Sequence, residues 1–200
     1  MNVKISPGNS KLGRIPSISL PSGLTCRKDS PCFAKCYAKK IERIRKSVRD
    51  AYQHNYDLLK TDSETYWREV EASIMMSRFF RFHVSGDIPD REYLHNMFEI
   101  AKRNRHCKIL CFTKKYELVN EYLNKVRYCP PNLHIIFSAW KDLDMNNPHR
   151  LPEAHVRFKD GTTTASDGAK ECGGNCSECA IIEDGCWNLK LGEQVVFNEH

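Results

Sequence analysis

The chain has 200 residues and a formal net charge of +6 at pH 7, with 40 % hydrophobic and 28 % charged residues. This length and composition are ordinary for one globular domain with its own core. No apolar run approaches the roughly 20 residues of a membrane helix, and residues 1–7 lack the apolar region of a signal peptide. We therefore expect neither a membrane protein nor a secreted one, but a cytoplasmic protein whose thiols are kept reduced.

In the first part of the chain, a segment without helical periodicity precedes a long helical pattern. Prolines and glycines interrupt residues 1–25, where apolar residues predict one short strand: Ile15, Ile18, Leu20 and Leu24. Between Tyr37 and Leu59 apolar residues recur at helical spacing, and Lys and Arg fill the opposite face. Such a basic run is more typical of a solvated helix face than of a binding site. Residues 61–64 offer cap residues for a second helix that ends near Met76.

A regular alternation of strands and helices follows. Strands are predicted at 79–84, 108–112, 133–138 and 154–158, and helices at 91–104 and 115–126. Short connections from strand to helix to strand are typical of parallel βα units. Because a complete barrel needs about 250 residues, we expect an α/β fold built as a partial, open βα barrel of five or six mainly parallel strands. We expect a single domain, in which 1–159 form the core and 160–200 form an irregular, cysteine-rich appendage.

Ten cysteines in a reducing compartment need a role other than disulfide bonds. Three of them lie among apolar residues and are interpreted as core: Cys107, Cys111 and Cys129. The other seven form two sets. The N-terminal set is Cys26, Cys32 and Cys36, and the C-terminal set is Cys172, Cys176, Cys179 and Cys186.

The C-terminal set places four thiols within fifteen residues. Glycines between them allow the backbone to fold around a small group. Four thiolates suit either a [4Fe–4S] cluster or tetrahedral zinc. Structural zinc usually takes two separated cysteine pairs, so the close spacing favours the iron–sulfur cluster.

The N-terminal set lies between the first predicted strand and the first predicted helix. In sheets of parallel strands, ligands bind beyond the carboxyl ends of the strands, where this loop is expected. Three thiolates on a four-iron cluster leave one iron open to a substrate. The alternatives are a loop whose thiols only pack, and a zinc site completed by a nearby histidine.

Several stretches of the sequence resemble one known family: residues 10–13, 19–23, 36–38, 82–89, 111–116 and 137–140. These stretches are similar to the bacteriophage gene-product-eighty-eight-like family, and the likeness covers nearly the whole chain. The resemblance implies a viral origin, and hence the cytoplasm of a host cell, but it implies little chemistry.

A more distant likeness is to radical S-adenosylmethionine enzymes, which use a full or partial βα barrel with a three-cysteine cluster after the first strand. The N-terminal set matches that placement, although its spacing is C-x₅-C-x₃-C where the superfamily has C-x₃-C-x₂-C. The turn after the second strand matches the place where the superfamily binds the methionine amino group. The likeness therefore implies S-adenosylmethionine as a cofactor held by Ser85, Gly86, Asp87 and Pro89.

Three further residues are candidates for catalysis because they follow predicted strands. His83 and Asp87 flank the turn after the second strand, and Lys114 follows the third. A histidine at a strand end is more often a hydrogen-bonded structural residue, and Lys114 with Lys115 also suits a helix start on the surface. Trp140 and Lys141 end the next strand. They either line the same site at the carboxyl ends of the strands or pack against neighbouring residues.

Three functions from different classes follow from these patterns. The first is an iron–sulfur protein with one or two [4Fe–4S] clusters that carries out redox or radical S-adenosylmethionine chemistry on an unknown substrate. The second is a zinc-stapled module that places the basic helix on nucleic acid, although a charge of +6 alone does not indicate nucleic-acid binding. The third is an electron carrier with a redox partner.

Overall fold

A computed structural model describes residues 2–183 and 185–199 of the chain. Its centre is a single sheet in which all neighbouring strands are parallel, in the order β1-β2-β3-β4-β5-β7-β6. The strands are β1 (Ser17–Ile18), β2 (Phe79–Phe82), β3 (Lys108–Thr113), β4 (Leu133–Ser138), β5 (Glu153–Arg157), β6 (Lys170–Glu171) and β7 (Gln194–Asn198). The helices are α1 (Ser22–Thr25), α2 (Tyr37–Ile44), α3 (Lys46–Thr61), α4 (Ser63–Met75), α5 (Arg91–Arg103), α6 (Tyr116–Val126) and α7 (Cys176–Cys179), and Pro31–Phe33 form a 3₁₀ turn.

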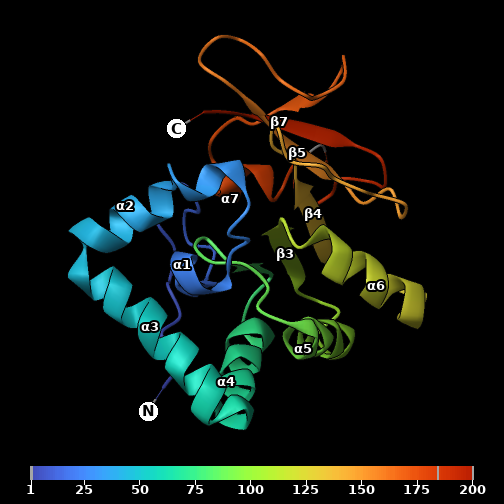
Figure 1. The fold of residues 1–200 in the computed structure, drawn as a ribbon. Helices are drawn as coiled ribbons and strands as arrows, with labels where there is room; N and C mark the ends of the chain where they lie inside the picture. The colour runs from blue at the N-terminus through green and yellow to red at the C-terminus, as the bar shows by residue number, and fades with distance from the viewer. Residues whose placement is uncertain (1, 184, 200) are drawn as a thin grey trace.

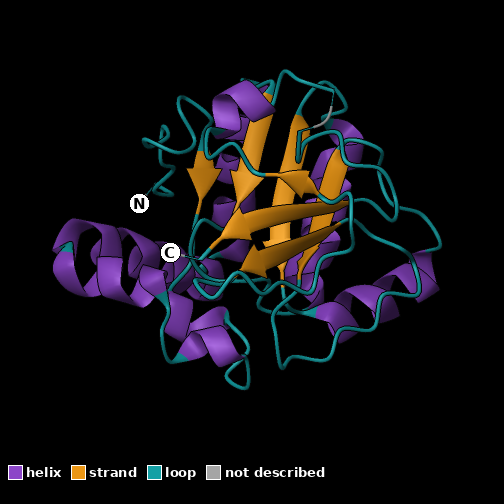
Figure 2. Cartoon of the chain, turned by 90° about the horizontal axis from the view of Figure 1, so that it is seen from above, coloured by secondary structure: helices purple, strands orange, loops and turns teal. Residues whose placement is uncertain are grey.

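The sheet is open, because β1 and β6 are its two edges and do not pair with each other. From β1 to β5 each strand is laid beside the one before it. Since parallel crossovers are right-handed, a steady order of this kind places the intervening helices on the same face of the sheet. Figures 1 and 2 show α3, α4, α5 and α6 along that face. The predicted open α/β fold with parallel strands is confirmed.

Two apolar cores result from the alternation of side chains along the strands. Phe80, Phe82, Ile109 and Ile135 pack beneath the helices, and the intervening residues Leu110 and Ile136 pack on the opposite, inner face. Cys107 and Cys111 are fully buried in the helix-side core and Cys129 packs against it. The prediction that these three cysteines belong to the core is confirmed.

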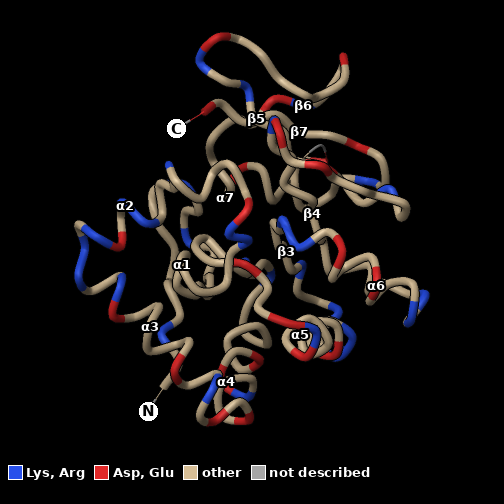
Figure 3. Tube along the Cα trace, viewed as in Figure 1, with Lys and Arg blue, Asp and Glu red and all other residues tan. Residues whose placement is uncertain are grey.

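The structure differs from the sequence prediction in the first long helix. Arg45 is extended (φ −111°, ψ 93°), which separates α2 from α3. The break turns α2 so that its apolar stripe is not buried: Ile41 and Ile44 are 39 % and 63 % exposed. The basic residues along α2 and at the start of α3 are mostly exposed (Figure 3), as expected for a solvated face. Leu24, predicted in the first strand, lies in α1 and is exposed.

The sheet has seven strands rather than five or six, because the segment after residue 160 adds two. β7 enters between β5 and β6 and pairs with both, so the C-terminal segment is not wholly irregular. Its remaining part, including α7, covers the inner face of the sheet. Ala180, Cys186, Trp187 and Leu189 pack there against Leu110 and Ile136.

Candidate metal centre

A cavity of about 770 Å³ lies over the inner face of the sheet and the carboxyl ends of its strands. Its wall includes residues that follow β2, β3 and β4, among them Asp87, Lys114 and Trp140. All seven cysteines of the N-terminal and C-terminal sets line this cavity, and none of the three core cysteines does. The fold therefore brings together two cysteine sets that are separated by 135 residues of sequence.

The N-terminal set lies in the loop from α1 to α2, with Cys36 directly before α2. Burial raises the pKa of the Cys26 thiol to about 12, and Asp87, Cys36 and Cys32 add to the increase, while Lys114 opposes it. The Cys32 and Cys36 sulfurs therefore lie close enough to Cys26 to act on its charge. Cys32 also has its sulfur 3.0 Å from the hydroxyl of Ser30.

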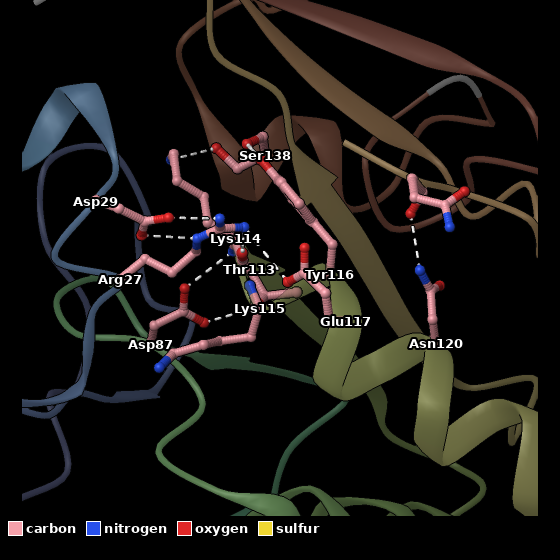
Figure 4. Close-up of polar contacts among 11 residues, drawn as sticks. Arg27, Asp29, Asp87, Thr113, Lys114, Lys115, Tyr116, Glu117, Asn120 and Ser138 are labelled. Carbon is pink, nitrogen blue, oxygen red and sulfur yellow. Dashed lines mark hydrogen bonds and ion pairs between the residues drawn. The ribbon is translucent and has the colours of Figure 1, made fainter. Parts of the chain in front are cut away.

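Arg27 anchors this loop to the start of α6 (Figure 4). Its guanidinium donates two hydrogen bonds to the carboxylate of Asp29, at 2.9 and 2.7 Å, and one to the carbonyl of Lys114 at 3.4 Å. Arg27 also stands over the ring of Tyr116, 5.5 Å from its centre. These contacts fix the backbone next to Cys26 against the start of α6.

The C-terminal set is held by backbone hydrogen bonds to other parts of the chain. The amide of Cys172 donates to the carbonyl of Val196 in β7, and the amide of Cys176 donates to the carbonyl of Lys11. The side chain of Asn175 accepts from the first amides of α7. The cysteines are therefore placed by the sheet edge and by the N-terminal segment, not only by their own loop.

Within the C-terminal set, Cys179 and Cys186 are in direct contact. The Cys186 amide donates a 3.2 Å hydrogen bond to the Cys179 sulfur, and hydrogen bonds from Cys186 lower the pKa of the Cys179 thiol. The hydrogen bond to Cys179, burial, and the nearby Cys179, Cys172 and Cys176 raise the pKa of Cys186. Cys172, Cys176 and Cys179 thus all lie close enough to Cys186 to act on its charge.

The turn after β2 contains the predicted cofactor residues. The carboxylate of Asp87 accepts hydrogen bonds from the Thr113 hydroxyl (2.6 Å) and the Lys114 amide (2.9 Å) (Figure 4). It also accepts one from the Ile88 amide (2.7 Å). Burial raises the pKa of Asp87, and these hydrogen bonds oppose the increase. Asp87 therefore joins the end of β2 to the end of β3 at the edge of the cavity.

Gly86 and Ser85 complete this turn. Gly86 has φ +82°, and a β-carbon there would lie 2.6 Å from the carbonyl oxygen of Leu20, so the close approach of the two loops requires glycine. Ser85 donates a 2.7 Å hydrogen bond to Glu42 of α2. Ser85, Gly86 and Asp87 line the cavity, whereas Pro89 is not among its lining residues.

The other catalytic candidates have different surroundings. Lys114 reaches the cavity and donates a 2.8 Å hydrogen bond to the Ser138 hydroxyl. His83 is buried, with Nε2 3.1 Å from the Tyr93 hydroxyl and Nδ1 3.8 Å from the Cys111 sulfur. Burial, together with Arg81, lowers the pKa of His83 to about 3, so the ring is neutral at pH 7. His83 also lines the cavity, and both of its ring nitrogens contact other buried side chains.

Sequence analysis did not identify Arg81, which stands on the inner face of β2. Its Nη1 is 3.9 Å from the Cys176 sulfur, and its guanidinium lies over the Phe112 ring, 4.9 Å from the centre. The signal was present: Arg81 is the one charged residue within the apolar strand Phe79–Phe82. A charged side chain on the inner face of a strand that is otherwise apolar indicates a function or a binding partner at that face.

The comparisons with known proteins give one family. The Gene product 88 family matches residues 3–185. The chain belongs to this family. Two phage relatives, the Gene 88 proteins of Mycobacterium phages L5 and D29, are 31 % and 30 % identical to the chain over 149 residues, which is 68 % of this chain and 61 % of each relative. No solved structure matches the chain.

The family assignment confirms the resemblance to a phage protein family that the sequence motifs indicated. The match contains the N-terminal set and three cysteines of the C-terminal set, and it ends one residue before Cys186. The chain spans about three fifths of the length of these two relatives. Among the described residues, no helix is long and apolar enough to cross a membrane.

The arrangement of the thiols bears on which metal group fits. Within residues 2–183 and 185–199, no three His, Cys, Asp or Glu side chains converge so as to hold a metal ion. Tetrahedral zinc holds four thiolates about 2.3 Å from a single ion, whereas a [4Fe–4S] cluster takes its thiolates on separate irons. Within the described residues the thiols therefore form no preformed coordination geometry for either group.

The surroundings of the C-terminal set also suit a group with negative charge. The Cys186 amide points at a sulfur, and amide hydrogen bonds to sulfur are among the features that tune iron–sulfur clusters. Burial raises the pKa of Cys176, and Arg81 and Lys11 oppose the increase. In the described part of the chain, the buried Nε1 of Trp187 and Nε of Arg81 have no hydrogen-bond partner, and both residues line the cavity. The residues present therefore fit an iron–sulfur cluster.

Proposed function

We propose that this Gene product 88 family protein binds iron–sulfur clusters of the [4Fe–4S] type in the cavity over its sheet. One observation carries the proposal: the seven cysteines of the two sets line a single cavity, and the three other cysteines do not. Cysteines that served only as small apolar residues would not be expected to divide in this way. The support for the proposal is the position of the seven cysteines around one cavity and the metal-binding chemistry of their thiols, not a preformed coordination geometry.

The C-terminal set would hold a cluster with four protein thiolates. Its backbone is fixed by the hydrogen bonds of Cys172 and Cys176 to β7 and to Lys11. Arg81, with Nη1 3.9 Å from the Cys176 sulfur, offsets negative charge on the thiolates. A closed site of this kind suits a structural or electron-transfer role.

The N-terminal set would hold a cluster with three protein thiolates. Such a cluster supplies one iron without a protein ligand, together with a one-electron redox couple. The turn Ser85–Asp87 and Lys114 line the same cavity and are placed to bind polar groups of a substrate. We propose S-adenosylmethionine as a cofactor for this set, and a redox or radical reaction as the activity. A reduced host cytoplasm, in which thiols remain free, is the compartment that this function requires.

The test is anaerobic purification of the full chain, followed by an absorption spectrum and metal analysis. We expect a brown protein with broad absorption at about 400 nm from thiolate-bound clusters. A colourless protein that contains stoichiometric zinc would overturn the proposal. It would favour the zinc-stapled module that carries the basic residues of α2 toward nucleic acid.

A further inference from the structure

Four aromatic rings in strands or just after them line the cavity and are named the ring wall: Phe112 in β3, Trp140 after β4, Phe158 after β5 and Phe197 in β7. The rings form two edge-to-face pairs. The centres of Phe112 and Phe197 are 5.8 Å apart, and those of Trp140 and Phe158 are 5.5 Å apart. All four side chains are half-buried, so each has surface that is open to a ligand.

The contact between Phe112 and Phe197 shows that the inner face is concave. Phe112 belongs to β3 and Phe197 to β7, and both β4 and β5 lie between these strands. In a flat sheet the two strands would be about 14 Å apart, at about 4.8 Å for each step. The curvature brings rings from distant strands together and leaves a hollow above them.

Each part of the ring wall has a cation beside it. Arg81 lies over Phe112 at 4.9 Å, Lys11 over Phe197 at 5.2 Å, and Lys114 over Trp140 at 5.6 Å from the ring centres. These three cations also line the cavity. The wall therefore combines aromatic surface with positive charge in contact with it.

Carboxylates balance the positive charge of the cavity only in part: Arg27 pairs with Asp29 and Glu117, neither of which lines the cavity. Among its described lining residues, six are Lys or Arg and two, Asp87 and Glu199, are acidic. Asp87 is already held by three donors, and Glu199 accepts the Lys159 amide at 3.1 Å. The buried Nε of Arg81 has no hydrogen-bond partner in the described part of the chain.

We infer that the ring wall and its cations bind a nucleoside monophosphate. A base stacks on an aromatic ring regardless of its identity, and a phosphate pairs with Arg and Lys. A cavity of about 770 Å³ is within the usual range for small-molecule sites. The inference deepens the proposed function by naming a ligand class for the same cavity, and it rests on that function only in placing the ligand beside the thiols.

Binding is measured by isothermal titration calorimetry on anaerobically purified full-length protein, with the four common nucleoside monophosphates, adenosine and inorganic phosphate as probes. We expect at least one monophosphate to bind about tenfold more tightly than adenosine or phosphate alone. Replacing one stacking ring, as in Trp140→Leu or Phe158→Leu, is expected to weaken binding about fivefold or more. Arg81→Gln is expected to weaken binding of the monophosphate but not of adenosine.

Two controls match these variants. Lys141→Gln removes one positive charge at an exposed residue outside the cavity lining, and Tyr128→Leu removes an exposed ring that is also outside it. Both are expected to bind like the unaltered protein. The inference is overturned if the cavity variants bind as tightly as these controls, if phosphate binds as well as any monophosphate, or if a six-nucleotide single strand binds more tightly than all of them. Since iron content is measured on the same samples, loss of nucleotide binding with iron retained leaves the proposed function standing.

Discussion

Gly185 packs directly against Cys179. A β-carbon at Gly185 would lie 1.8 Å from the Cys179 carbonyl oxygen and 2.8 Å from its sulfur. Neither contact can be relieved by rotating a flexible side chain, because one partner is backbone and the other is a short thiol. The sequence Gly185-Cys186 thus permits the contact between Cys186 and Cys179 that closes the C-terminal set.

Gly185→Ala is therefore expected to lower the free energy of unfolding by about 3 kcal/mol, the upper range for overpacking, and to reduce the iron content. Gly173→Ala is the matched control, since a β-carbon there would have no atom within 4 Å. Urea denaturation of both variants checks the prediction. Equal stability of the two variants would show that the loop accommodates the added carbon and does not enclose a fixed group.

Cys179→Ala is expected to lower both iron content and melting temperature, because a closed four-thiolate site contributes directly to folding free energy. Cys129→Ala is the control, since Cys129 is a half-buried cysteine that does not line the cavity. The control is expected to lose some stability through the small cavity it creates but no iron. If Cys179→Ala leaves iron and melting temperature unchanged, the C-terminal set does not bind the metal.

The buried His83 gives a prediction about pH. Because the pKa of His83 falls from 6.5 to about 3 in the folded protein, the unfolded chain binds more protons between these values. Stability is therefore complete above about pH 6.5 and falls as the pH falls, by about 2 kcal/mol between pH 7 and pH 5. In His83→Asn this part of the dependence is expected to disappear, and asparagine tolerates the positive φ of 59°.

Chemical denaturation of both proteins at pH 7 and pH 5 measures this dependence. Burial lowers the pKa of His134 to about 4. Because His134 is present in both proteins, its contribution to the pH dependence of stability cancels when the two are compared. An identical loss of stability in both proteins would mean that His83 is hydrated or protonated in the folded state. That result would return His83 to the candidates for acid–base catalysis.

The N-terminal set makes a spectroscopic prediction. S-adenosylmethionine added to the reduced protein is expected to change the electron paramagnetic resonance spectrum of one cluster, and Cys32→Ala is expected to abolish the change. Cys129→Ala should leave the change intact, because it removes a cysteine outside the cavity. If neither the spectrum nor calorimetry detects binding, the enzyme proposal fails, and an iron–sulfur protein with an electron-transfer or structural role remains.

The sequence predicted the elements whose signals are local. Strands β2, β3 and β4 are apolar along their length, and Asp62 and Asp90 cap α4 and α5 through side-chain hydrogen bonds. These elements lie within two residues of their predicted bounds. The break at Arg45 was missed because neither proline nor glycine marks it and the apolar spacing continues through it. The changed direction of α2 is accompanied by contacts with distant residues: Glu42 of α2 accepts hydrogen bonds from Ser22 and Ser85.

The candidate site was predicted in its residues but not in its arrangement. Both cysteine sets were identified from spacing, yet nothing in the spacing indicates that they line one cavity. Their meeting depends on β6 and β7, two short strands that were not predicted: β6 ends directly before Cys172, and the Cys172 amide donates to Val196 in β7. The surroundings of Arg81 could not be predicted from the sequence, because it is the curved sheet that brings Phe112, its partner ring Phe197 and Cys176 together near Arg81.

The most direct test of the central claim is the content of iron, zinc and acid-labile sulfide per chain, measured on three anaerobically purified proteins. These are the unaltered chain, a variant with serine at all three cysteines of the N-terminal set, and a variant with serine at all seven cavity cysteines. The account predicts iron and sulfide in equal amounts in the first, about half as much in the second, and none in the third. Stoichiometric zinc without sulfide, or iron that persists in the third protein, would contradict it.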